Sequence, residues 1–172
     1  TYQVRLTVDG VTRTEQFDLL KDPRLTEVTQ ADFVAQFDLA MAVHARFNDA
    51  TMAVTRIRAL RGEVDDRVQS AADVQVTQAG TALATNLRDV EGDLYEGGAE
   101  AQSDLKHFGT RLANHLSYLK GVVMGADARP TQQSFQVLEE ISVELDAHLE
   151  RLELILGDEL DRFNDLLREK GL

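Results

Sequence analysis

The spacing of the apolar residues changes once along this chain, and that change most restricts the fold. From Tyr2 to Val8, apolar and polar residues alternate, which is typical of a half-buried strand, and a second strand is expected from Val11 to Leu19. Beyond Thr29, apolar residues recur every three or four positions, which predicts amphipathic helices. Pro23 lies between the two patterns and ends the strand, because proline fixes φ and lacks an amide donor. The sequence therefore predicts a mainly α chain with an N-terminal β-hairpin.

The hairpin is predicted from two strand patterns on either side of Asp9-Gly10. This pair is favoured in two-residue turns, because both turn positions require a positive φ. An isolated hairpin is at best marginally stable in water, so we expect its apolar face to be covered. The cover could be the helices, the other strands of a β-sandwich, or a partner at the free strand edge. Thr1 and Tyr2 lead directly into a strand, which favours a start inside a larger fold.

Four helices are predicted, over residues 29–69, 73–95, 103–124 and 131–169. Their order is long, short, short, long, and we expect an antiparallel four-helix bundle in which the two long helices run antiparallel. We assign residues 1–21 to the hairpin, 22–28 to a linker and 29–172 to the bundle. The first helix is expected to direct the following residues toward the core: Phe33, Phe37, Ala40, His44, Phe47, Thr51, Val54, Ile57, Val64 and Val68.

Composition excludes several classes of partner and chemistry. The 172 residues include 30 acidic and 18 basic ones, which gives a net charge of −12. This charge repels a phosphate backbone, so we expect neither nucleic acid nor an anionic membrane surface as partner. No apolar run approaches the roughly 20 residues of a membrane span. The chain has no cysteine, which removes thiol catalysis and thiolate metal sites.

Three histidines are the only candidate metal ligands that the pattern offers. His44, His115 and His148 lie on or beside predicted apolar stripes, and three inward histidines could bind a divalent metal in a bundle core. The Glu-x-x-His pairs of di-iron bundles are absent. Two interpretations stay open: histidines that form hydrogen bonds at helix edges, or a small metal-binding bundle enzyme. We expect the first, with no cofactor and no catalytic residue.

Charged residues elsewhere indicate solvated helix faces. Sequence alone shows no pair of carboxylates that converges on a cleft. Those that fit a solvated face are Glu91, Glu139, Glu140, Glu144 and Glu150. Arg56, Arg58 and Arg61 form a basic cluster on the first long helix. We expect them to pair with the acidic fourth helix, each pair contributing at most about 1 kcal/mol at a surface.

The order of several segments resembles the C-terminal region of bacterial BNR-repeat proteins. These are large β-propeller proteins of the sortilin-like type, often labelled glycosyl hydrolase-like. The resemblance covers nearly the whole chain. It rests on Tyr2 to Gly10, Asp22-Pro23-Arg24, Gln36-Phe37, Ile57 to Arg61, Arg111 to Leu116 and Ala126 to Thr131.

The resemblance implies an arrangement and a role. In that family a propeller precedes an immunoglobulin-like sandwich, and the helical region comes last. Residues 2–19 would then be the end of a truncated sandwich, and the parent protein would be exported to the periplasm, the surface or the medium. Any hydrolase activity would belong to the propeller.

We therefore expect a non-catalytic C-terminal helical interaction or structural module. Its partner would be its own upstream propeller and sandwich domains, another protein, or a second copy of the chain bound through the hairpin edge. The alternative is the metal-binding bundle enzyme that uses His44, His115 and His148.

Overall fold

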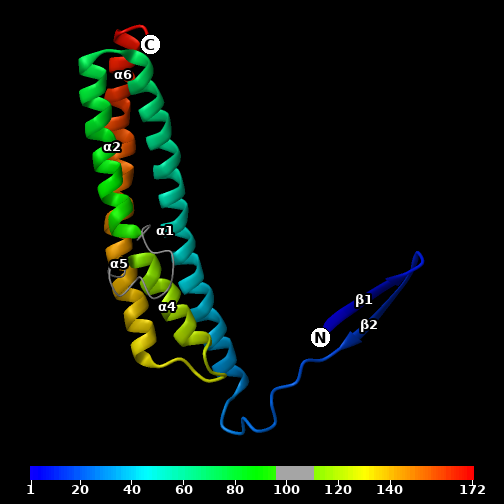
Figure 1. Cartoon of the computed structure of the whole chain (residues 1–172). Coiled ribbons are helices and arrows are strands. Elements are labelled where there is room, and N and C mark those ends of the chain that lie inside the picture. Colours follow the sequence, from blue (N-terminus) through cyan, green and yellow to red (C-terminus); the bar gives the residue numbers. More distant parts are fainter. Residues whose placement is uncertain (96–110) are drawn as a thin grey trace, which may run out of the picture.

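The computed structural model describes residues 1–95 and 111–172. The described residues form a bundle of helices with a two-stranded antiparallel hairpin at the N-terminal end (Figure 1). The expected mainly helical class with an N-terminal hairpin is confirmed. Part of the helix predicted over 103–124 lies outside the described residues.

The hairpin consists of β1 (Tyr2–Val8) and β2 (Val11–Phe17). Its turn residues Asp9 and Gly10 have φ values of 48° and 78°, as the predicted turn requires. In the antiparallel register, Tyr2 lies opposite Phe17 and Val8 lies opposite Val11. The turn and the strand alternation together fix which side chains share a face.

The first two helices reverse direction at a short connection. α1 (Gln30–Ala71) begins at Thr29, whose side chain accepts from the amide of Asp32 while the Asp32 carboxylate accepts from the amide of Thr29. This capping box confirms the predicted helix start. α1 ends where Ala72 adopts a left-handed conformation. Asp73 then caps α2 (Val74–Leu94) by accepting two backbone amides.

The last long helix contains one π-helical turn. The described chain continues with α4 (Leu112–Met124), α5 (Gln132–Leu154), the π-turn η1 (Ile155–Glu159) and α6 (Leu160–Glu169). Core residues Ile155 and Phe163 are eight positions apart, one more than the seven that span two α-helical turns. A π-turn absorbs one extra residue, so both side chains can face the core.

The two long helices run parallel, and the prediction that they pair antiparallel is wrong. Near one end of the bundle, Asp32 of α1 forms an ion pair with Arg129, just before α5. At the other end, Asp73 follows α1 and pairs with Lys170, just after α6. α2 and then α4 run back along the bundle, opposite to α1. The last long helix, α5–α6, then runs in the same direction as α1 (Figure 1).

The core seam of α1 agrees with the predicted stripe at Val54, Ile57 and Val64 and departs from it in the first turns of the helix. The fully buried residues include Val43, Ala50, Ile57 and Val64, which are seven positions apart. This heptad spacing keeps one seam toward the neighbouring helices over the length of α1. Phe37, which we expected in the core, is 64% exposed. None of the described helices is both long and apolar enough to cross a membrane.

Candidate interaction surface

The three candidate histidines form no metal site within residues 1–95 and 111–172. The Nε2 atom of His44 on α1 lies 3.4 Å from the side-chain amide nitrogen of Asn48 on the same helix. His148 of α5 points Nδ1 toward Asp93 of α2, at 3.6 Å. His115 lies on α4. In the described ranges, no three His, Asp or Glu side chains gather as metal ligands would. The described structure therefore gives the metal-enzyme interpretation no support.

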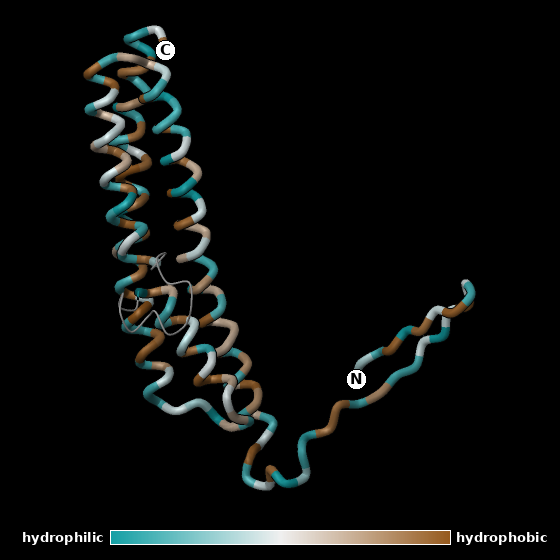
Figure 2. The backbone as a smooth tube through the Cα atoms, viewed as in Figure 1, coloured by the Kyte–Doolittle hydropathy of each residue, from teal (hydrophilic) through white to brown (hydrophobic). Residues whose placement is uncertain are grey.

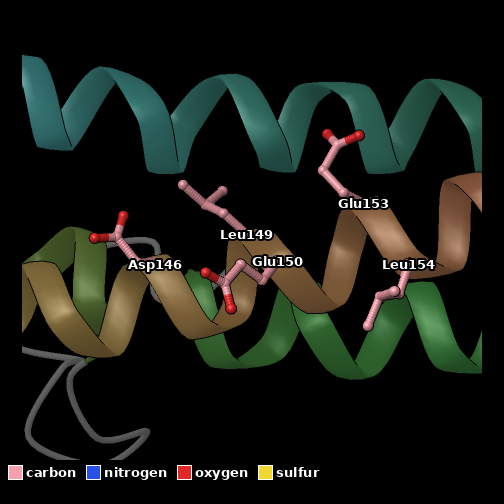
Figure 3. Close-up of a pocket in the computed structure, with 5 residues that line it drawn as sticks. All are labelled: Asp146, Leu149, Glu150, Glu153 and Leu154. Carbon is pink, nitrogen blue, oxygen red and sulfur yellow. The ribbon is translucent and has the colours of Figure 1, made fainter.

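A shallow hollow on α5 brings carboxylates close together without making them converge. Its lining consists of Asp146, Leu149, Glu150, Glu153 and Leu154. Figure 3 shows the three carboxylates spread along the helix and pointing in different directions. Arg46 of α1 forms an ion pair with Asp146. Arg56 pairs with Glu153 at 2.8 Å. Two of the three charges are thus matched by α1, and the hollow lacks the facing acid pair of a glycosidase.

The predicted basic cluster divides between two helices. Arg56 contacts the fourth predicted helix, as expected, whereas Arg58 and Arg61 bind Glu91 of α2 at 2.6 and 2.7 Å. The Arg58 guanidinium also lies over the ring of Tyr95, 5.4 Å from its centroid. The Glu91 side chain is only 14% exposed, so the prediction of a solvated face is wrong for this residue. These contacts hold α2 against α1 and are structural.

One face of the hairpin carries apolar side chains that residues 1–95 and 111–172 leave uncovered. Residues directly opposite in an antiparallel pair share a face, so β1 and β2 gather their apolar side chains on one side. The exposed fractions of these side chains range from 49% to 64%. We define the open apolar face as the side of the hairpin that carries Tyr2, Val4, Leu6, Val8, Val11 and Phe17. Two charged residues of β2, Arg13 and Glu15, lie on the same side, opposite Leu6 and Val4.

The opposite face of the hairpin is polar. It carries Gln3, Arg5, Thr7, Thr12, Thr14 and Gln16. This contrast is typical of a sheet that packs on one side and faces water on the other. Neither strand packs against any described helix, and the hairpin extends away from the bundle (Figures 1 and 2). The open apolar face is therefore the strongest candidate for an interaction surface.

The linker between hairpin and bundle is held by its own contacts. The ammonium group of Lys21 donates to the carbonyl oxygen of Val28 at 2.7 Å. The Arg24 guanidinium forms hydrogen bonds with both carboxylate oxygens of Asp22, and this contact lowers the pKa of Asp22. The amide of Leu25 donates to the carbonyl of Asp22. These bonds give residues 21–28 a defined turn between β2 and α1.

Sequence alternation identified the apolar face, since its residues follow the period-two pattern. The pattern did not identify what covers that face. The covering surface belongs to other chains or segments, and the spacing of apolar residues does not determine their position. Compared with known protein families, curated proteins and solved structures, the chain gives no significant match.

Proposed function

We propose that this chain is a non-catalytic helical interaction module of a larger BNR-repeat propeller protein. Its hairpin would supply the last two strands of an upstream β-sandwich, and its helices would pack beside that domain. The observation that carries the proposal is the open apolar face, which no described helix covers. Mainly apolar side chains on one face of the hairpin and polar side chains on the other match the outermost hairpin of a two-sheet sandwich.

Burial of this face would supply enough energy to matter. Complete burial of a large apolar side chain contributes about 1.5–3 kcal/mol, so each of the six half-exposed side chains still has on the order of 1 kcal/mol to gain. An isolated hairpin is marginally stable at best. Docking would therefore add several kcal/mol to an element that has little stability of its own.

The described residues favour an interaction role over catalysis. Asp146 and Glu153 on α5 pair with arginines of α1. Glu91 of α2 is held by two further arginines of α1. By the resemblance of residues 2–10 and 126–131 to the BNR-repeat family, any hydrolase chemistry would belong to the propeller. The same resemblance favours an exported parent protein.

A calorimetric titration tests the proposal. The chain is titrated into the polypeptide encoded directly ahead of Thr1 in its reading frame, which is expected to contain the propeller and sandwich strands. We expect saturable binding with a negative heat-capacity change, because apolar surface is buried. Val4→Asp should weaken binding at least about tenfold, since it places a charge in an apolar contact.

The matched control is Gln3→Asp, which places the same charge on the polar face of the same strand. It should leave the affinity within about twofold of the native chain, as expected for a surface substitution. Absence of binding, or equal weakening by both variants, would contradict the proposal.

A further inference from the structure

The first turns of α1 carry a second uncovered apolar surface. Val34, Phe37 and Met41 are spaced by three and four residues and therefore lie on one face of α1. They are exposed, with Phe37 at 64%. From Gln30 to Asp38, no residue of α1 is fully buried. We define the N-terminal patch as these three residues together with Leu19 and Leu20, which follow β2 in the connection to α1 and are also exposed.

Hydrogen bonds hold the backbone beneath this patch in place. The amide group of Gln36 donates to the carbonyl oxygens of Val123 at 2.7 Å and Ala126 at 2.6 Å, which holds α1 to the end of α4. The capping box of Thr29 and Asp32 completes the first turn. A surface that is already fixed loses little conformational entropy on binding. The exposed apolar patch therefore resembles a preorganised docking surface.

The patch is continuous with the base of the hairpin. An open hollow of about 540 Å³ lies between them. Its lining includes Tyr2 from β1, Leu19 and Leu20 from the linker, and Val34 and Phe37 from α1. The apolar side chains of hairpin, linker and helix thus line one common space. A body that covers the hairpin face at this end would also reach the patch.

We infer that the N-terminal patch is the docking surface for the same β-domain that the hairpin completes. This inference rests on the proposed function. Only 12 residues separate β2 from α1, and their turn is held by internal hydrogen bonds. Packed sheets lie about 10 Å apart, so a sandwich built on the hairpin lies directly beside this linker. A short tether gives millimolar effective concentration, which lets a modest apolar contact form.

Charge makes a second copy of the chain a poorer occupant. Each chain carries a net charge of −12, so two copies brought together repel one another. Along α1, the N-terminal patch ends before the exposed Met52, because the polar residues Asn48 and Asp49 interrupt the apolar residues there.

Methionine oxidation provides the test, because the chain carries one reporter inside the patch and one beyond it. Met41 and Met52 both lie on α1 and are 49% and 71% exposed. Both chain 1–172 and the longer chain of the same reading frame, with its upstream domains, are treated with dilute hydrogen peroxide. Peptide mass spectrometry gives the oxidation rate at each methionine. In the longer chain we expect Met41 to oxidise at least fivefold more slowly, and Met52 to change by less than twofold.

Two variants of the longer chain complete the test. Phe37→Asp should restore the fast oxidation of Met41, because a charge in the patch opposes docking. Val143→Asp, at an exposed position on α5, should leave Met41 protected. Both sites are largely exposed, so neither change is expected to unfold the bundle.

Hydrogen exchange at β1 in the same samples separates the two proposals. Protected strands with unchanged Met41 oxidation would overturn this inference and leave the proposed function standing. Exchange of the β1 amides that is equally fast in both chains would overturn the proposed function, and this inference with it, at any oxidation rate of Met41. A reading frame without a β-domain ahead of Thr1 would have the same consequence for both.

Discussion

The ring of Tyr2 stacks on the ring of Phe17, with centroids 5.7 Å apart and planes inclined by 24°. The two residues lie opposite each other at the open end of the hairpin, and both rings are about half exposed. Such a pair contributes about 0.5–1.5 kcal/mol beyond its area burial. Because neither strand packs on a described helix, this contact stabilises the hairpin without stabilising the bundle.

Phe17→Ala should therefore loosen the hairpin and leave the bundle intact. We expect the thermal midpoint of the helical circular dichroism signal to stay within about 1 °C of the native value, because the bundle loses no contact. A loss of 1 kcal/mol in the bundle itself would shift the midpoint by about 2–4 °C. The control is Phe163→Ala, at a position 3% exposed, which should cost about 3–5 kcal/mol. Comparable shifts in the two variants would show that the hairpin packs on the helices.

Gly80 of α2 is required by close packing. A Cβ atom there would lie 2.3 Å from Cγ2 of Val68 and 3.2 Å from the ring of Phe163. Gly80→Ala should therefore destabilise the chain by about 1–3 kcal/mol in urea unfolding. Gly62→Ala, where a Cβ meets nothing within 4 Å, should stabilise it by up to about 1 kcal/mol. Similar effects of the two substitutions would contradict this packing.

Glu91 should contribute more to the free energy of unfolding than an exposed carboxylate does. Glu91→Gln weakens the hydrogen bonds with Arg58 and Arg61 at a largely buried site, and we expect a loss of about 1.5–3 kcal/mol. Glu153→Gln breaks an exposed pair with Arg56 and should cost less than about 1 kcal/mol. Denaturant unfolding of both variants gives the comparison. A larger effect at Glu153 would refute the role assigned to Glu91.

The cap of α2 should make stability depend on acid pH. The amide of Val76, then Lys170, lower the pKa of Asp73 below its ordinary 3.8. The unfolded chain therefore binds this proton more tightly, and the stabilisation is present above pH 3.8 and lost as pH falls through the lower folded value. Asp73→Asn should be less stable than the native chain at pH 6, and the difference should shrink at pH 2.5. A difference independent of pH in urea unfolding would contradict this linkage.

The sequence predicted those elements whose signals are local. Asp9-Gly10 specified the turn by its need for positive φ, and the capping box of Thr29 and Asp32 marked the start of α1. The direction of the long helices was not predictable in this way. It depends on α2 and α4 both running back along the bundle, and periodicity contains no information on that choice.

The surface site was predictable only in part. The alternation in β1 and its pairing with β2 defined the open apolar face, whereas the exposure of Phe37 was missed. Phe33 and Phe37 lie at helical spacing, and the pattern could not distinguish a core face from a second apolar face. The heptad at Val43, Ala50 and Ile57 is the signal that would have separated the two.

Hydrogen exchange at β1 tests most directly whether the hairpin belongs to a larger sheet. The amides of residues 2–8 are followed in chain 1–172 and in the longer chain of the same reading frame. We predict exchange at least a hundredfold slower in the longer chain, because the strand edge and the open apolar face are then covered. Equal rates in the two chains would contradict the account.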